Sequence, residues 1–286
     1  MMTFASGPQR HYYGKGDVIA YRLNRDSRTP AGQNPVFGAS VLMLLYGDAF
    51  WPTYTTGDNS SLIATDSMKN FIQRETMNFV GYDLEGYCAF LAEKFLKQYP
   101  QVEGLQVSAD QIPYEPLDRA KPVTFFPSGP DRARAQVELG RKGFIEVKSA
   151  IRGFKLLRLS GSAFKGFVRD EYTTLPDLHD RPLYMWLDLE WSYTRPEDGF
   201  AGGAATARAR QIVHEVFSSF ESGSIQQVIY QMGARLLAEI PSMAEVHLEA
   251  NNRTWDTIAE QGDRLGVYTD PRPPFGCLGL TLKRNS

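Results

Sequence analysis

Leu183-Tyr184-Met185-Trp186-Leu187-Asp188-Leu189-Glu190-Trp191 is a run in which every second side chain, starting at Leu183, is strongly apolar. Side chains point alternately to the two faces of a β-strand, so this pattern places Leu, Met, Leu, Leu and Trp on one face. The acidic residues Asp188 and Glu190 fall on the other face. The run therefore predicts a strand with one buried and one exposed face, to which neighbouring elements pack.

Working outward from this strand, the second half of the chain reads as strand, strand, helix, helix, strand, strand. Apolar residues at three- and four-residue spacing indicate the helices, and Val-, Ile- and Leu-rich extended runs indicate the strands. Ser224 and Gln227 have the spacing of a capping box, in which each side chain satisfies a free backbone N–H at the helix start. The predicted elements are residues 143–159, 183–191, 212–220, 225–240, 245–255 and 276–283.

The first half repeats this order, which predicts two ββααββ domains, 1–141 and 142–286. Its predicted elements are residues 17–24, 38–46, 67–78, 84–96, 105–112 and 133–139. We expect an α+β fold in which each domain is a four-stranded, mostly antiparallel sheet with its helix pair on one face. Such a sheet leaves two edges unpaired, so we also expect oligomerisation by edge pairing into a closed barrel.

Composition argues against nucleic-acid-binding and membrane proteins. The chain has 286 residues, 42% of them hydrophobic and 22% charged, with 31 Lys+Arg against 33 Asp+Glu. This near balance argues against a nucleic-acid partner and against a polybasic membrane anchor. Apolar runs such as residues 41–45 are far shorter than the roughly 18 residues of a membrane span. With no secretory signal pattern and only Cys88 and Cys277, we expect a cytoplasmic protein in which both thiols are buried.

The motifs of common catalytic classes are absent from the sequence. It has no Walker A loop, no GxSxG and no HExxH, and Gly14-Lys15-Gly16 lacks the third glycine of a dinucleotide-binding motif. Its histidines stand singly, so we expect an enzyme of this sequence to work without a metal. The phrase Tyr13-Gly14-Lys15-Gly16 is either a turn with a solvated lysine or a lysine held against another backbone. In residues 64–70, Thr65 or Asp66 is either a helix N-cap or part of a helix start that favours an anion or an activated hydroxyl.

Two further phrases lie in the second half. Residues 164–175, followed by Asp180-Arg181, put charged and aromatic side chains into a long connection without periodicity, which is typical of a functional loop. Arginine offers a planar fork to an anion, and phenylalanine offers a face to a flat ring. Asn252 continues the apolar face of its predicted strand, so it lies either at an exposed strand end or in a site.

Together these phrases resemble the cofactor-independent urate oxidases (uricases) of the bacterial kind. The matching phrases are Tyr13-Gly14-Lys15, residues 64–70, residues 166–175 and Ser224-Ile225-Gln226. The resemblance implies two tunnelling-fold (T-fold) domains per chain and a homotetrameric barrel with active sites between subunits. It also implies the conversion of urate, O2 and water to 5-hydroxyisourate and H2O2 without a cofactor.

The resemblance assigns roles to one set of residues around the purine. Arg181 and Gln226 are expected to hold opposite edges of urate, and Phe164 is expected to stack on its face. Leu175 and the backbone of Ile225 are expected to shape the pocket. A planar, electron-rich anion fits this combination of charge, amide and aromatic face.

A second set is expected to manage protons and oxygen. From the neighbouring subunit, Thr65 and Asp66 would approach the ring, with Lys15 behind Thr65 as a proton acceptor through its hydroxyl. Asn252 would hold oxygen or water above the urate plane. The sequence departs from the family at Thr254, where many relatives have a histidine in an Asn-Lys-His phrase.

Two other readings stay open at this point. One is a non-catalytic purine-binding T-fold protein that has kept the pocket and lost the proton relay. The other is a T-fold enzyme that handles a pterin or GTP, although such enzymes typically need a zinc-binding His/Cys set.

Overall fold

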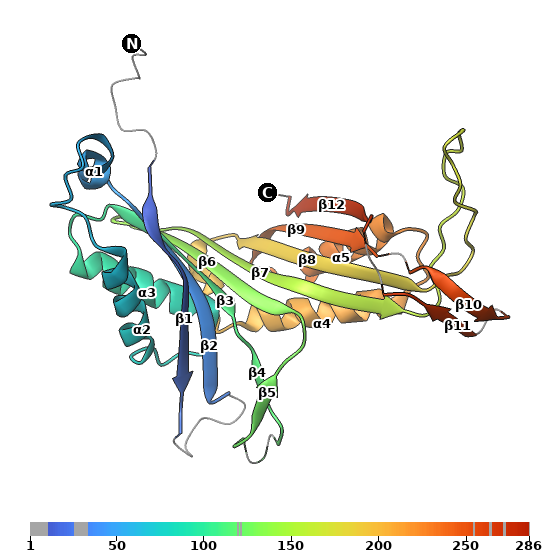
Figure 1. Cartoon of the computed structure of the whole chain (residues 1–286), viewed down its shortest axis with the longest axis horizontal. Coiled ribbons are helices and arrows are strands. Elements are labelled where there is room, and N and C mark those ends of the chain that lie inside the picture. The colour runs from blue at the N-terminus through green and yellow to red at the C-terminus, as the bar shows by residue number, and fades with distance from the viewer. Residues whose placement is uncertain are drawn as a thin grey trace, which may run out of the picture. The chain divides into compact units, whose positions relative to one another are not determined.

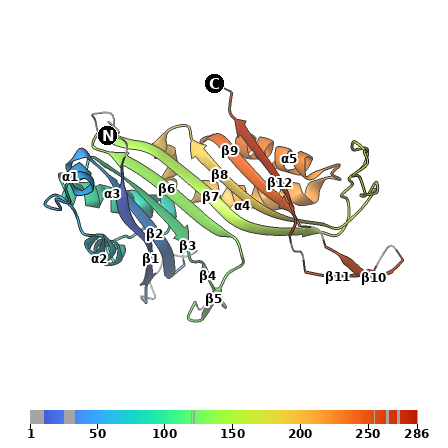
Figure 2. The ribbon, with the colours of Figure 1, turned by 45° about the horizontal axis from the view of Figure 1, so that its top comes forward.

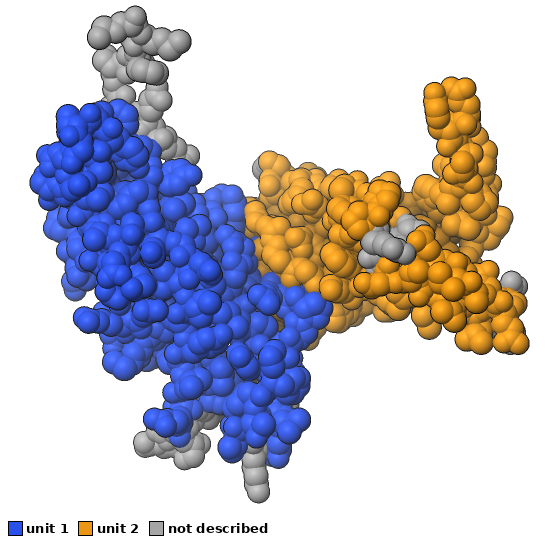
Figure 3. Space-filling model, viewed as in Figure 1, with its two compact units in different colours: residues 1–149, 195–203 blue, residues 150–194, 204–286 orange. Residues whose placement is uncertain are grey.

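The computed structural model describes residues 11–25, 34–118, 120, 122–253, 255–262, 265–270 and 273–285. The chain divides into two compact units (Figure 3). The first comprises Met1–Ser149 and Arg195–Gly203, and the second comprises Ala150–Thr194 and Ala204–Ser286. Among the described helices, none has the length and apolar character needed to cross a lipid bilayer.

The first unit is a four-stranded antiparallel sheet with two long helices, in the strand order β1-β2-β3-β6 (Figure 1). Strands β4 and β5 form a separate hairpin between β3 and β6. A 3-10 turn covers Asp48–Phe50. The named elements are β1 (Tyr13–Leu23), β2 (Val36–Tyr46), α1 (Trp51–Thr55), α2 (Thr65–Thr76), α3 (Leu84–Gln98), β3 (Gly104–Gln111), β4 (Tyr114–Pro116), β5 (Phe125–Pro127) and β6 (Arg132–Gly140).

Strand β1 begins earlier than predicted because the phrase around Lys15 is itself extended. Gly14 lies so close to β2 that a Cβ there would come within 1.9 Å of the Met43 carbonyl oxygen. The hydroxyl of Tyr13 accepts a hydrogen bond of 3.0 Å from the Ile63 N–H, ahead of α2. A register shift between Lys15 and Val18 follows. The turn reading of this phrase is therefore wrong.

Gly14→Ala should destabilise the protein by roughly 1–3 kcal/mol, the cost of forcing a methyl group into a packed site. Gly16→Ala is the matched control, because a Cβ there meets only the flexible Leu42 side chain, at 3.2 Å. Denaturant midpoints at one protein concentration measure both effects. Equal midpoints for the two variants would contradict the close approach.

Helix α3 carries a tyrosine, Tyr87, whose side chain is fully buried in the core. Tyr87 is 0% exposed, and its hydroxyl lies 2.6 Å from that of Thr76 in α2. Thr76 also donates to the Ile72 carbonyl at 2.7 Å. Burial, the largest cause, raises the pKa of Tyr87 to about 12, although the hydrogen bond with Thr76 lowers it in part.

We predict that Tyr87 contributes to alkaline unfolding. An unfolded tyrosine ionises near pH 10 and Tyr87 near pH 12, so its stabilising contribution is complete below pH 10 and is lost as the pH rises to 12. At about 1.4 kcal/mol per pKa unit, the loss is about 3 kcal/mol. Tyr87→Phe should therefore lose less stability than the wild type between pH 10 and 12, measured by denaturant unfolding. Tyr230→Phe, at a side chain 52% exposed, should follow the wild type.

The second unit has the same order of strands and helices (Figure 1). Strand β7 begins in the first unit and ends in the second, and β8, β9 and β12 pair antiparallel in that order. Helix α5 lies along β9 and β12 in both ribbon views (Figures 1 and 2). The elements are β7 (Gly143–Arg158), β8 (Leu183–Tyr193), α4 (Ala204–Ser219), α5 (Ile225–Glu239), β9 (Met243–Asn252), β10 (Thr257–Gln261), β11 (Leu265–Tyr268) and β12 (Gly276–Lys283).

The structure confirms the strand predicted from the alternating run. Along β8, from Leu183 to Tyr193, buried residues alternate with half-buried ones, and Trp191 is 1% exposed. Other bounds differ: α4 begins at Ala204 rather than at residue 212, and β9 ends at Asn252 rather than at residue 255.

The expectation that both thiols are buried is wrong for one of them. Cys88 is fully buried in α3, but Cys277 is exposed. It lies near the start of β12, whose residues alternate between exposed and half-buried positions from Cys277 to Lys283. Cys277 therefore does not belong to the core.

Candidate active site

A cavity of about 480 Å³ lies entirely within the second unit. Its walls come from the connection between β7 and β8, the first turn of α5, the ends of β9 and β12, and the β10–β11 hairpin. This volume is within the usual range for small-molecule sites, about 300–1,000 Å³. The lining residues are Phe164, Leu175, Leu178, Asp180, Arg181, Pro182, Tyr184, Ile225, Gln226, Asn252, Arg253, Trp255, Thr257, Glu260, Tyr268, Gly276, Cys277 and Leu278.

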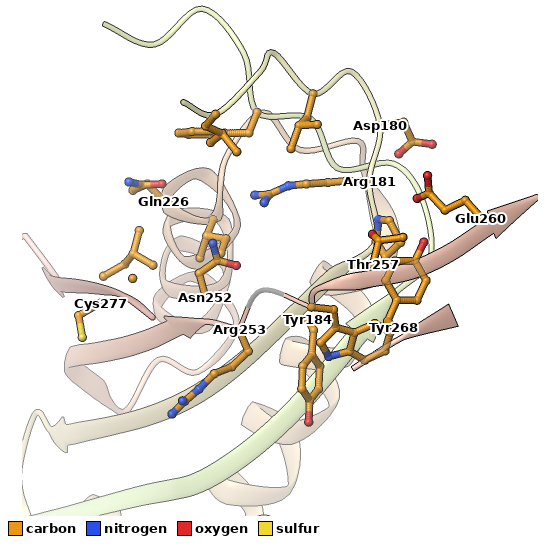
Figure 4. A pocket seen from close by; sticks show the side chains of 18 residues that line it. Asp180, Arg181, Tyr184, Gln226, Asn252, Arg253, Thr257, Glu260, Tyr268 and Cys277 are labelled. Carbon is orange, nitrogen blue, oxygen red and sulfur yellow. The ribbon is translucent and has the colours of Figure 1, made fainter. Parts of the chain in front are cut away.

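The structure brings together every predicted purine contact of the second half. The six residues are Phe164, Leu175, Arg181, Ile225, Gln226 and Asn252. In Figure 4 the guanidinium of Arg181 extends toward Gln226 and Asn252. Residues from a loop, a helix start and a strand end, up to 88 positions apart, thus line one cavity.

Arg181 brings a half-buried positive charge to this cavity. Its Nε is buried and has no hydrogen-bond partner, and no carboxylate pairs with its guanidinium in the part of the chain that the structure describes. Burial lowers the pKa of Arg181, and it is the only cause of the shift. A desolvated arginine with unused donors favours an anionic ligand that accepts two hydrogen bonds.

Phe164 is held at the edge of the cavity by backbone pairing across the loop. Its N–H donates to the Leu178 carbonyl at 2.8 Å, and the Leu178 N–H donates back at 2.9 Å. The ring stacks on Phe167 with centroids 5.0 Å apart and planes at 14°. The guanidinium carbon of Arg181 lies 5.7 Å from the Phe164 centroid. The loop thus presents a cation and an aromatic face together.

Gln226 enters the cavity from the first turn of α5. Ser224 is the N-cap, and its hydroxyl accepts from the Gln227 N–H at 3.2 Å, which confirms half of the capping box. The Gln227 side chain accepts at 2.8 Å from the N–H of Gly223, not from that of Ser224. The two caps fix the helix start, so Gln226 can present its amide to one edge of a ligand.

Asn252 is the last residue of β9, flanked on both sides by strands. It pairs with Met185 of β8 and Gly276 of β12. The exposed-end reading therefore does not apply, because Asn252 lines the cavity. The next residue, Arg253, extends away from Arg181 in Figure 4, and its guanidinium carbon lies 3.9 Å from the ring centroids of both Trp186 and Phe275.

The other predicted site residues form a separate group in the first unit. Lys15 lies in β1, and Thr65 and Asp66 begin α2. The N-cap is Ala64, with no side-chain capping bond, so the N-cap reading of Thr65 and Asp66 is wrong. Asp66 accepts from Lys69 at 2.5 Å, and this contact above all lowers the pKa of Asp66, with a smaller contribution from the charge of Lys15.

Among the described residues, no group of three or more His, Cys, Asp or Glu side chains is arranged to hold a metal ion. A family model described as Uricase matches residues 48–140 and 147–277.

The chain belongs to the uricase family.

Individual uricase relatives agree with this assignment. The chain is 36% identical to the uric acid degradation bifunctional protein PucL of Bacillus subtilis over 95% of its own length, and it spans 60% of that longer relative. It is 35% identical to the uricase of Haloferax volcanii, covering 95% of this chain and 97% of that protein. A crystal structure of urate oxidase from Bacillus sp. TB-90 matches with a TM-score of 0.87 and 35% identity, over 96% of this chain and 100% of that one.

Several residues that line this cavity were not predicted from the sequence. Trp255 lies 5.4 Å from Tyr184 and 5.5 Å from Tyr268 between ring centroids, and the three form an aromatic wall. Thr257 and Glu260 come from β10. The aromatic residues Trp255 and Tyr268 could have indicated this wall from the sequence. The β10–β11 hairpin, whose second strand ends at Tyr268, was not predicted. Thr254, where the resemblance led us to expect a departure from the family's histidine, lies outside the described residues.

Proposed function

We propose that this chain is a urate oxidase that converts urate, O2 and H2O to 5-hydroxyisourate and H2O2. Two electrons leave the purine and reduce O2 to peroxide, while water supplies the new hydroxyl, so the reaction balances without a cofactor. One observation carries the proposal. The half-buried guanidinium of Arg181, which has no carboxylate partner among the residues described, lies in one cavity with Phe164, Gln226 and Asn252.

In this proposal, Arg181 and the amide of Gln226 bind opposite edges of the urate anion. Phe164 stacks on the ring, while Leu175 and the backbone at Ile225 close the remaining sides. A planar anion satisfies the guanidinium and is at the same time fixed in orientation. Orientation of the substrate against O2 is a large part of what the protein has to supply.

We assign proton transfer to Lys15 and Thr65, with Asp66 beside the ring. The first turn of α2 and strand β1 carry these groups within the first unit, and the pKa of Asp66 responds to the charge of Lys15. Lys15 accepts a proton through the Thr65 hydroxyl, and Asn252 holds O2 or water above the ring. General acid–base catalysis of this kind typically contributes about 10²–10⁴-fold.

The two groups of residues meet, in our proposal, across subunits of a homotetramer. Each chain then contributes tandem T-fold domains, 1–141 and 142–286, to a closed barrel in the cytoplasm. Strand β1 supports edge pairing, because Ile19, Tyr21 and Leu23 expose 47%, 49% and 62% of their surfaces. Apolar side chains on an end strand favour pairing with a second copy.

The decisive experiment incubates metal-stripped protein with urate in air and follows urate absorbance and peroxide together. Loss of absorbance with one peroxide per urate is the expected result. Binding of urate or 8-azaxanthine without turnover would instead identify a purine-binding protein. Zinc found by elemental analysis of the protein before it is stripped, with no urate turnover, would favour a pterin- or GTP-handling enzyme.

A further inference from the structure

Three arginines each follow or end a strand and cap the last turn of a helix. They are Arg141 after β6, Arg158 at the end of β7 and Arg284 after β12. Each guanidinium donates to two backbone carbonyls three residues apart, which satisfies acceptors that have no partner within a helix. The carbonyl pairs belong to Leu96 and Tyr99, to Phe217 and Phe220, and to Leu237 and Ile240, respectively.

Arg158 differs from the other two in what its second amino group contacts. Nη1 caps α4 through Phe217 at 3.0 Å and Phe220 at 2.7 Å. Nη2 donates to the Gly161 carbonyl at 2.8 Å and to the hydroxyl of Ser222. Ser222 is 2% exposed. One planar group therefore joins the end of α4, the loop after β7 and the segment before α5.

The segments that Arg158 joins are those from which the cavity residues project. The Ser222 N–H donates to the Gly161 carbonyl at 2.9 Å, and the Ala163 N–H donates to the Ser222 carbonyl at 2.8 Å. The Arg181 N–H donates to the Ser162 carbonyl at 2.9 Å. The backbone of Arg181 thus depends on a loop that Arg158 holds.

The carboxylate of Asp180 also binds the loop after β7. Asp180 accepts from the N–H of Gly161 at 2.7 Å and from that of Ser162 at 3.3 Å. Burial lowers the pKa of Arg158, and the charges of Asp180 and Glu221 offset part of this shift. Arg158 and Asp180 therefore fix the carbonyl and the N–H of Gly161, respectively.

We propose that Arg158 is a positioning residue for purine binding, which fixes the separation of Phe164 and Arg181 from Gln226 through its bonds to Gly161 and Ser222. This inference rests on the proposed urate-binding role of the cavity. Arg158 does not line the cavity. It acts through the backbone that carries the binding groups, because its planar guanidinium bonds to Gly161 in the loop and to Ser222 ahead of α5 at the same time.

The test compares Arg158→Met with Arg284→Met, since both lose a helix cap but only the first loosens the loop. The readouts are the 8-azaxanthine Kd by calorimetry at 25 °C, KM and kcat for urate, and Tm. Arg158→Met should raise Kd and KM together by about tenfold to 100-fold, the penalty of displaced binding groups. Arg284→Met should lower Tm while leaving Kd within about twofold of the wild type, because a lost cap costs stability and not ligand contacts.

Arg158→Lys keeps the positive charge that Arg158→Met removes, but it loses the planar guanidinium. Its Kd should therefore fall between those of the wild type and Arg158→Met. An unchanged Kd in Arg158→Lys and Arg158→Met overturns the inference, as does an equal rise in Arg284→Met. If the wild type itself neither binds 8-azaxanthine nor consumes urate, the proposed function fails instead. The two failures are therefore distinguishable.

Discussion

Arg181→Ala should weaken urate binding by roughly 2–5 kcal/mol, the cost of truncating a buried charged group that pairs with its ligand. Among the described residues, the half-buried guanidinium of Arg181 has no carboxylate partner and its buried Nε has no hydrogen-bond partner, so its donors stay free for a ligand. Burial is the cause that lowers its pKa. Most of its hydrogen-bonding capacity is then available to the ligand. KM for urate and the Kd for 8-azaxanthine measure the loss.

Two variants separate the contributions to this loss. Arg181→Lys keeps a positive charge without the bidentate fork and should recover only part of the affinity. Arg210→Ala is the matched control, because the Arg210 guanidinium carbon also lies over a phenylalanine, at 5.8 Å from the Phe154 centroid, but outside the cavity. An unchanged KM in Arg181→Ala would remove Arg181 from the substrate site.

Lys15→Met and Thr65→Ala should each lower kcat by about 10²–10⁴-fold, the usual contribution of a positioned acid–base group. The double variant should be little worse than either single variant, because two residues that pass one proton act as a unit. Steady-state kcat for the three variants measures this non-additivity. Affinity for 8-azaxanthine should change much less than kcat.

Lys94→Met provides the control for losing a lysine in the same unit, since Lys94 pairs with Glu75 at 2.5 Å and lies away from the first turn of α2. Its kcat should equal that of the wild type. If the loss of kcat in the double variant equals the product of the losses in Lys15→Met and Thr65→Ala, the two residues do not share one relay.

The elements with strong periodicity could be predicted from the sequence, and those without it could not. The alternation in β8 and the apolar stripe of α5 each identify their element, because one face must be buried. The start of α4 was missed since Ala204–Arg210 reads AATARAR, which favours a helix by composition but has no apolar stripe. The short hairpins β4–β5 and β10–β11 have too few residues for a period to show.

The grouping of the second-half residues in one cavity was predictable for a different reason, whereas the role of Lys15, Thr65 and Asp66 stays a prediction. Local patterns left Asn252 and the phrase around Lys15 undecided, and only the family resemblance joined them with Arg181 and Gln226. Chain topology, which no local pattern encodes, brings Gln226 and Asn252 to one cavity with Arg181. The aromatic wall of Trp255 and Tyr268 was missed because its position depends on a hairpin that follows the last predicted strand residue.

The arginine caps described above also limit how the protein can be shortened. Each helix residue turns the backbone by about 100°, so adding or deleting one residue near the end of α3, α4 or α5 would rotate the terminal carbonyls away from Arg141, Arg158 or Arg284. The hairpin β4–β5 pairs only with itself among the strands that the structure describes. A shortened version of the protein is therefore best sought by trimming that hairpin, while the lengths of the three helices are kept.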